Sequence, residues 1–321
     1  MASATLAILL LSLLPSPSLH SQELKVASFN IRYENSGDYS RGNGWDDRYP
    51  WICSLIRYER PDLLGCQEVL KDQLSDMAAS LPGYAYVGVG RDDGKSAGEH
   101  EVVLWRTDRF DLQDKGWFWL SETPDRPGLG WDAACVRICT YVKLLDKVSS
   151  KNVWMFNLHM DHVGVVARRE GAKLVVSKIR ELVLPGQMVF LCGDFNVDQD
   201  NEIYTIFTTS GILEDSYETA ADRYAPTGTA NTFDPNSFTK SRIDHIFVSP
   251  GTVVENYAVL TETYRGSVTL RSHTPQSGNA VPVQGQEGTF KSDNFPKEVS
   301  FERNIAKTPS DHFPVFIRVK L

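Results

Sequence analysis

The strongest constraint on the fold is a series of short apolar runs that read as β-strands, several of which end in a polar residue. Such runs cover residues 24–31, 62–66, 84–89, 101–105, 136–144, 152–160, 188–192, 243–248 and 313–320. Segments with helical spacing lie between them at 51–58, 71–81 and 168–184. With 321 residues and 41% hydrophobic content, the chain has ample apolar material for a large buried core. The polar strand ends are therefore the first place to look for a functional site.

Eight polar residues lie at or just beyond the apolar runs. They are Asn30, Glu68, His159, Asp194, Asn196, Asp244, Asp311 and His312. Taken singly, Asn30 suits a turn at a strand end, and Glu68 suits the cap of the helix that follows. Coincidence at eight positions is improbable, so we predict that these side chains form one site.

The segment Asp194-Phe195-Asn196 follows an apolar strand directly. Side chains two positions apart on a strand point the same way. Asp194 and Asn196 therefore suit a base that takes a proton from water and an amide that orients that water. A purely structural turn is the alternative for this segment taken alone.

Histidines and carboxylates recur at the other strand ends. His159 ends an apolar run, with Asp161 expected on the same face of the strand and His162 on the opposite one. Asp244 opens another strand, and an Asp from one strand end can fix the tautomer of a His from another. Hard oxygen ligands such as Glu68 favour Mg²⁺, with Mn²⁺ or Ca²⁺ as alternatives.

The chemistry-bearing residues run from one end of the chain to the other, so we expect residues 22–321 to form one domain. Residues 261–310 are rich in Ser, Thr, Gly, Gln and Pro and predict a long surface insertion. Residues 1–21 contain the apolar run LAILLLSLL, which is too short to span a bilayer and resembles a secretory signal peptide. The sequence thus predicts a secreted protein, extracellular or periplasmic, with no transmembrane segment.

The order of the short motifs resembles the endonuclease/exonuclease/phosphatase superfamily. The motifs are SFNIR (28–32), GCQE (65–68), NLHMDH (157–162), GDFN (193–196), RIDHIF (242–247) and SDHFPV (310–315). That superfamily includes pancreatic-type deoxyribonucleases, inositol polyphosphate 5-phosphatases and neutral sphingomyelinases. The resemblance implies an α/β fold, a four-layer α-β-β-α sandwich of two mixed β-sheets flanked by helices. It also implies a phosphoric ester hydrolase that uses a divalent metal.

The resemblance assigns roles to the predicted residues. Glu68 is expected to be the main metal ligand, assisted by Asn30 and Asp311. Asp194 and Asn196 are expected to activate and orient the attacking water. His312, supported by Asp244, would contact the phosphate and stabilise its developing charge, while His159 would bind the phosphate or protonate the leaving oxygen. Arg137 is a candidate for a phosphate oxygen, with a structural salt bridge as an equal alternative.

The substrate is less constrained than the chemistry. A phosphorylated small molecule and a nucleic acid both fit the motifs, although the formal net charge of −8 does not favour nucleic acid. A binding module that has kept the fold but lost its activity is the alternative from another class. The five cysteines, Cys53, Cys66, Cys135, Cys139 and Cys192, show no metal-site spacing, so we interpret them as structural.

Overall fold

The computed structural model describes residues 23–266 and 304–321. The predicted signal peptide and the middle of the predicted insertion lie outside these ranges. The first sheet has the strand order β10-β12-β15-β1-β2-β4-β3. Its strands are β1 (Glu23–Asn30), β2 (Leu63–Val69), β3 (Tyr84–Val87), β4 (His100–Arg106), β10 (Asp222–Tyr224), β12 (Val253–Val259) and β15 (Val315–Lys320).

The second sheet has the strand order β5-β6-β7-β8-β11-β9. Its strands are β5 (Phe110–Trp119), β6 (Ile138–Asp146), β7 (Asn152–His159), β8 (Met188–Asp194), β9 (Glu214–Asp215) and β11 (Asp244–Val248). Both sheets are mixed, because β1 pairs in parallel with β2 and β7 with β8, whereas most other pairs are antiparallel.

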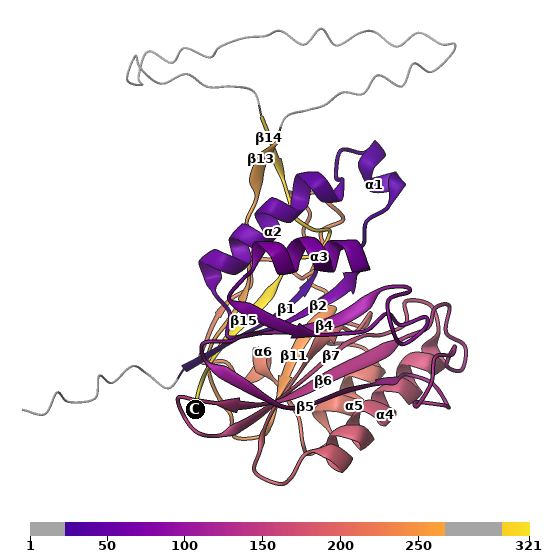
Figure 1. Cartoon of the computed structure of the whole chain (residues 1–321), viewed down its shortest axis with the longest axis vertical. Coiled ribbons are helices and arrows are strands. Elements are labelled where there is room, and N and C mark those ends of the chain that lie inside the picture. Colours follow the sequence, from indigo (N-terminus) through magenta and orange to yellow (C-terminus); the bar gives the residue numbers. More distant parts are fainter. Residues whose placement is uncertain (1–22, 267–303) are drawn as a thin grey trace, which may run out of the picture.

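Helices cover the outer face of each sheet, as Figure 1 shows. The helices are α1 (Ser36–Ser40), α2 (Trp45–Glu59), α3 (Lys71–Ser80), α4 (Val165–Leu182), α5 (Glu202–Thr208) and α6 (Ser216–Thr219). Ile52 of α2 and Met77 of α3 belong to the core on the first sheet, while Ile179 of α4 belongs to the core on the second. A third core, which includes Val26 and Met155, fills the space between the sheets. The predicted four-layer sandwich is confirmed.

Every strand and helix that the sequence predicts is present, with ends shifted by a few residues. The prediction missed β5 and β12 among the longer strands. β5 is an edge strand whose middle is exposed and polar, and β12 has a bulge around Glu255 that interrupts its apolar pattern. Neither segment shows the continuous apolar run of a buried strand.

The two sheets approach most closely beside Gly65 of β2. A Cβ atom at this position would lie 2.4 Å from Cys192 Sγ and 2.8 Å from Asn157 Oδ1, so only glycine fits. Asn157 of β7 is fully buried there and crosses to the first sheet. Its amide donates to the carbonyls of Cys66 (2.8 Å) and Val102 (2.9 Å), and its oxygen accepts from the Gln67 amide (2.6 Å).

We expect Asn157→Ala to lower the free energy of unfolding by about 2–4 kcal/mol, because it leaves several buried polar groups unpaired and opens a small cavity. Urea denaturation followed by circular dichroism measures this loss. Asn236→Ala, in an exposed loop, is the matched control and should stay within about 0.5 kcal/mol of the wild type. Equal free energies of unfolding for the two variants would show that the Asn157 hydrogen bonds do not stabilise the fold.

The predicted insertion is anchored by a short antiparallel pair, β13 (Tyr264–Gly266) with β14 (Ile305–Lys307). Figure 1 shows this pair standing above α2, and Tyr264 stacks on Trp51 with a centroid distance of 5.1 Å. Ser310 is fully buried, so the surface insertion ends before it. Segment 267–303 lies outside the described residues.

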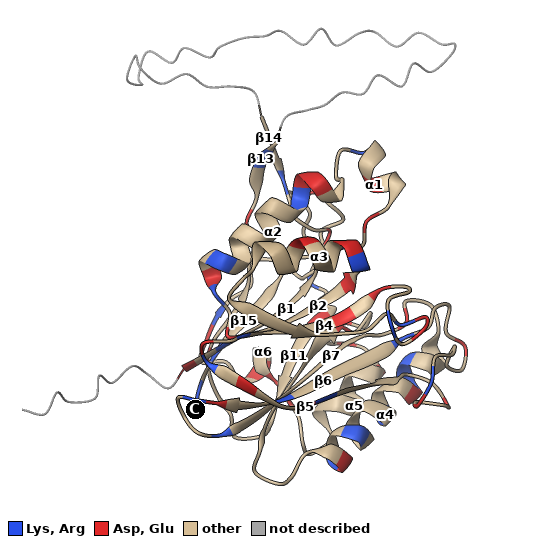
Figure 2. Cartoon of the chain, in the orientation of Figure 1, with Lys and Arg blue, Asp and Glu red and all other residues tan. Residues whose placement is uncertain are grey.

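The charged residues and the cysteines are spread over several of the described elements. Acidic and basic positions are interspersed along the described elements (Figure 2). The five cysteines are unpaired, and four of them are buried. Within residues 23–266 and 304–321, no helix combines the length and the apolar character needed to cross a membrane.

Candidate active site

Strand ends from both sheets meet at one edge of the sandwich. Asn30 ends β1 and Glu68 lies near the end of β2, whose partner strand runs parallel to it. His159 ends β7 beside Asp194, which ends the parallel strand β8. Asp244 opens the antiparallel strand β11 directly opposite Asp194. Because parallel neighbours end at the same edge, the topology gathers these five side chains.

A pocket of about 520 Å³ opens at this edge. Six of the predicted residues line it together with Arg137: Glu68, His159, Asp194, Asn196, Asp311 and His312. Asn30 and Asp244 are fully buried and support residues of this lining. The structure therefore brings all nine predicted site residues together.

The backbone of the site is held in left-handed conformations that side chains rarely adopt. The φ angle is 62° at Glu68, 50° at Asn196 and 60° at Arg32. Glu68 lies where the pairing of β2 with β4 shifts register, and such a bulge re-aims a side chain. Gly193, with φ 150°, passes so close to Leu158 that a Cβ atom would lie 2.0 Å from its carbonyl oxygen. Strain of this kind concentrates at functional sites.

Asn30 orients two carboxylates. Its Nδ2 donates to Glu68 Oε1 at 2.9 Å and to Asp194 Oδ2 at 3.1 Å. Its Oδ1 accepts from the backbone N–H of Arg32 at 3.0 Å, which fixes the orientation of the amide. We predicted that Asn30 assists Glu68 as a metal ligand. In this arrangement Asn30 turns its N–H groups, and not its oxygen, towards Glu68 and Asp194.

Asp194 is almost completely buried at the centre of the site. Burial, together with the nearby charge of Asp244, raises the pKa of Asp194 to about 7. Its Oδ1 accepts the backbone N–H of Asn196 at 2.9 Å. A carboxylate with a pKa near neutrality suits the predicted role of general base.

His159 is held as a neutral imidazole. Burial, reinforced by the positive charge of Arg137, keeps the pKa of His159 well below its ordinary value. Asn196 Nδ2 donates to His159 Nε2 at 3.0 Å, which leaves the ring proton on Nδ1. Glu101 of β4 lies within 4.8 Å of a His159 ring nitrogen, and both of its carboxylate oxygens are buried without a hydrogen-bond partner among the described residues. The sequence did not single out Glu101.

His312 forms the predicted pair with Asp244. Its Nδ1 lies 2.8 Å from Asp244 Oδ2, and its Nε2 lies 3.8 Å from Asp194 Oδ2. Burial alone would lower the pKa of His312, but Asp244 and the other carboxylates outweigh it and hold this pKa well above its ordinary value. These carboxylates favour the protonated ring, whose Nε2–H can donate a hydrogen bond to a phosphate oxygen.

The carboxylates fit a hard divalent cation. Glu68 and Asp194 offer carboxylate oxygens that lie within 4.8 Å of each other. Burial, with repulsion from Glu68, raises the pKa of Asp311, so a bound cation would offset unfavourable negative charge. The Arg32 guanidinium occupies this region, with Nη1 3.6 Å from Asp311 Oδ2 and 3.9 Å from Glu68 Oε2. Arg32 is a second site residue that the sequence did not single out.

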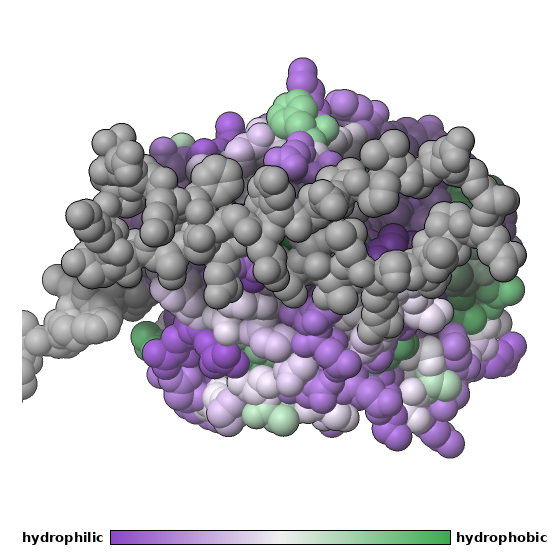
Figure 3. Space-filling view, turned by 90° about the horizontal axis from the view of Figure 1, so that it is seen from above, coloured by the Kyte–Doolittle hydropathy of each residue, from purple (hydrophilic) through white to green (hydrophobic). Residues whose placement is uncertain are grey.

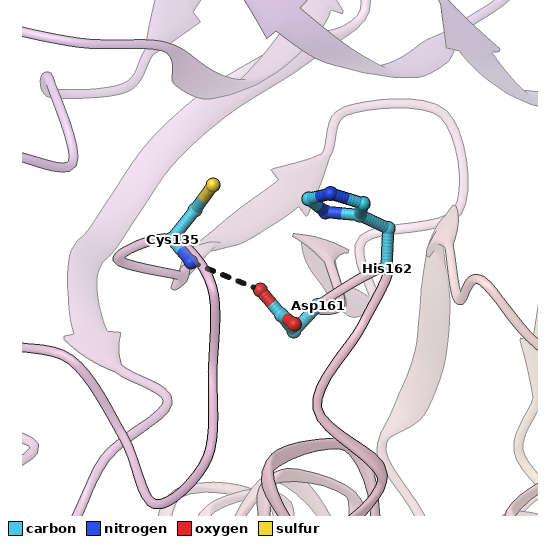
Figure 4. Close-up of side chains that lie close together, drawn as sticks. All are labelled: Cys135, Asp161 and His162. Atoms are coloured by element: carbon cyan, nitrogen blue, oxygen red, sulfur yellow. Dashed lines mark hydrogen bonds between the residues drawn. The ribbon is translucent and has the colours of Figure 1, made fainter.

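A second cluster with metal-ligand character, Cys135, Asp161 and His162, does not fit a cation (Figure 4). Asp161 already accepts four backbone N–H groups, from residues 134, 135, 163 and 164. The Arg137 guanidinium lies 3.5 Å from Asp161 and 3.1 Å from His162 Nδ1, so positive charge is present already. Asp161 serves to fix the two loops that border the pocket.

Arg91 and Glu99 form an ion pair that lines the pocket. The two Arg91 Nη atoms donate to the Glu99 carboxylate at 2.6 and 2.9 Å. Asp93 holds the loop between them by accepting three backbone N–H groups, and Trp119 donates to the Arg91 carbonyl at 2.7 Å.

Arg48 of α2 is fully buried behind the site and contacts backbone carbonyls instead of a carboxylate. Its Nη1 donates to the carbonyls of Ile31 (2.8 Å) and Pro309 (3.0 Å), and Nη2 donates to that of Arg32 (3.2 Å). Arg48 thereby fixes the end of β1 relative to the segment that carries Asp311.

We expect Arg48→Lys to weaken divalent-metal binding by about 10- to 100-fold, because one ammonium group cannot reach the same carbonyls as the guanidinium. Calorimetric titration with Mn²⁺ measures the affinity, and circular dichroism checks the fold. Arg57→Lys, on the exposed side of the same helix, is the matched control and should bind the metal as the wild type does. Unchanged affinity in a folded Arg48→Lys variant would contradict this role.

The comparisons with known proteins agree with the geometry. The model of the endonuclease/exonuclease/phosphatase family matches residues 27–312, a range that contains all nine predicted site residues. The chain belongs to this family. The predicted fold class and the predicted enzyme class, a phosphoric ester hydrolase, are confirmed.

Solved structures resemble the chain over nearly its whole length. A Bacteroides thetaiotaomicron mannosyl-6-phosphatase is 46% identical, with a TM-score of 0.81, and the match covers 93% of this chain and 100% of that one. A Bacteroides vulgatus protein of the same family is 33% identical, with a TM-score of 0.74 over 93% and 99% of the two chains. An uncharacterized protein of Acanthamoeba polyphaga mimivirus is 28% identical over 54% of this chain and 68% of its own.

Proposed function

We propose that the protein is a secreted, divalent-metal-dependent phosphatase that removes a phosphate group from a sugar hydroxyl. One observation carries the proposal: Glu68, Asp194 and His312 line the same pocket. They supply a metal ligand, a base for the attacking water and a hydrogen-bond donor for the phosphate. The 46% identity to a mannosyl-6-phosphatase over nearly the whole chain supports a sugar phosphate as the substrate class.

Each residue of the site has its own role in the proposed reaction. Asp194 takes the proton of the attacking water. The side-chain oxygen of Asn196, whose Nδ2 donates to His159 and Met160, accepts from that water and orients it. His312, kept protonated by Asp244, donates a hydrogen bond to the phosphate as negative charge develops. A divalent cation held by Glu68 and Asp311 would supply further positive charge for the phosphoryl and leaving oxygens.

The size of the pocket favours a compact substrate. A volume of about 520 Å³ is typical of small-molecule sites. Seen from above, the described residues are mainly hydrophilic, with hydrophobic patches towards the right-hand edge (Figure 3).

The experiment that tests the proposal is a hydrolysis panel on residues 22–321 with and without Mg²⁺. It compares mannose 6-phosphate, glucose 6-phosphate, an aryl phosphomonoester, an aryl phosphodiester and single-stranded DNA, with EDTA as the control. We expect the sugar phosphates to be cleaved fastest and EDTA to stop the reaction. Preferred cleavage of DNA would favour the nuclease alternative, and no cleavage of any substrate would favour the inactive binding module.

Secretion needs a separate test, because it depends on residues 1–21. Expression of the full chain and of residues 22–321, each with a C-terminal tag, compares their export. We expect the full chain to be exported and to lose its first residues, which mass spectrometry of the N-terminus detects. Retention of the uncleaved full chain inside the cell would contradict secretion.

A further inference from the structure

Two side chains of the pocket, Arg137 and His162, have no part in the mechanism described above. Arg137 lies before β6 and is 4% exposed, and His162 follows β7 with an exposed side chain. Both line the pocket that contains Asp194 and His312. They belong to two different loops, which Asp161 joins through the four backbone N–H groups that it accepts.

Arg137 has hydrogen-bond donors to spare. Its Nη2 contacts His162 Nδ1 at 3.1 Å, and its Nε lies 3.5 Å from Asp161 Oδ2 without a hydrogen bond. Nε and Nη1 are buried and have no partner within the described residues. A buried guanidinium with unpaired N–H groups beside a pocket is costly unless a ligand completes its contacts.

The contact with Arg137 also fixes the state of His162. A guanidinium can only donate, so His162 Nδ1 must accept, and the ring proton lies on Nε2. His162 therefore presents an Nε2–H donor, and Arg137 adds a permanent positive charge behind it. The backbone contacts of Asp161 hold both loops in place, so these donors are oriented before a ligand arrives.

Donors of this kind match an anionic oxygen. A phosphomonoester carries three terminal oxygens and a charge of about −1.5 to −2 at pH 7, whereas a phosphodiester carries two terminal oxygens and one charge. We propose that Arg137 and His162 bind the third terminal oxygen, so that His162 determines the preference of the site for phosphomonoesters over phosphodiesters. This inference rests on the proposed phosphatase function.

The test is a comparison of one aryl phosphomonoester with the corresponding diester. We expect His162→Ala to lower kcat/KM for 4-nitrophenyl phosphate by about 10- to 100-fold, the range expected for a lost hydrogen bond to a charged group. The value for bis(4-nitrophenyl) phosphate should change less than about threefold, because the diester lacks the third terminal oxygen. His162→Gln keeps a side-chain N–H and should recover part of the monoester activity.

Val148→Ala, at an exposed position that does not line the pocket, is the control and should leave the ratio of the two rates unchanged. An equal loss for both esters, or no loss for either, would overturn the inference, since a merely structural role cannot change the ratio. Calorimetric binding of inorganic phosphate to the same variants decides the inference independently of turnover. We expect about tenfold weaker phosphate binding in His162→Ala, and unchanged binding would overturn it. An inactive wild type that still binds phosphate through His162 would refute only the proposed function.

Discussion

Asp194→Asn should lower kcat by about 10²- to 10⁴-fold while the protein stays folded. The substitution keeps the shape of the side chain, and an Asn oxygen can still accept the backbone N–H of Asn196, as Asp194 Oδ1 does at 2.9 Å. What disappears is a carboxylate whose pKa burial and Asp244 raise to about 7, and which can therefore accept a proton from water near neutral pH. Steady-state kinetics at saturating substrate and Mg²⁺ measure the loss.

Asp198→Asn provides the matched control. Asp198 lies four residues further along, accepts from Ser241 Oγ at 2.9 Å, and does not line the pocket. We expect its kcat to stay within about threefold of the wild type, as surface changes usually cost little. Retention of full activity by a folded Asp194→Asn variant would refute the assignment of Asp194 as the base.

Much of the fold and of the site was predictable because strand ends leave a local signature. An apolar run followed by a polar residue, as in Val189–Asp194, identifies both a buried strand and a side chain at its end. Antiparallel pairing of β15 with β1 places the start of β15 beside the end of β1, which explains why His312 and Asn30, 282 positions apart in the sequence, reach the same site. The order of the motifs made the resemblance to the family specific.

The supporting residues were not predictable, because their roles depend on tertiary contacts alone. From the sequence, Arg48 is a candidate for a basic groove or an ordinary core or rim residue, yet it is buried against three loop carbonyls. Glu101 reads as the polar start of an apolar strand, yet it lies beside His159. Thr229, in a polar loop, accepts the backbone N–H of Asp244 at 3.1 Å. Neither the periodicity nor the spacing of residues predicts contacts between segments that lie so far apart in the sequence.

The geometry also sharpens the expected role of Asn30. The sequence resemblance made it a metal ligand, but its N–H groups face Glu68 and Asp194 while its oxygen is held by Arg32. Glu68 therefore stays the predicted main metal ligand. Its left-handed backbone and its contact with Tyr33 N–H at 3.1 Å fix the direction of its carboxylate.

Glu68→Gln should weaken Mn²⁺ binding by at least about 100-fold and lower kcat/KM by about 10³-fold, because several kcal/mol of charge stabilisation depend on the cation. A Gln oxygen can still accept from Asn30, so the fold should persist, and thermal unfolding without metal checks this. Calorimetry with Mn²⁺ measures the affinity directly. Glu181→Gln, exposed on α4, is the matched control and should bind as the wild type does. If activity is lost while the Mn²⁺ affinity is unchanged, Glu68 contacts the substrate and is not a metal ligand. Asp311 would then be the principal ligand.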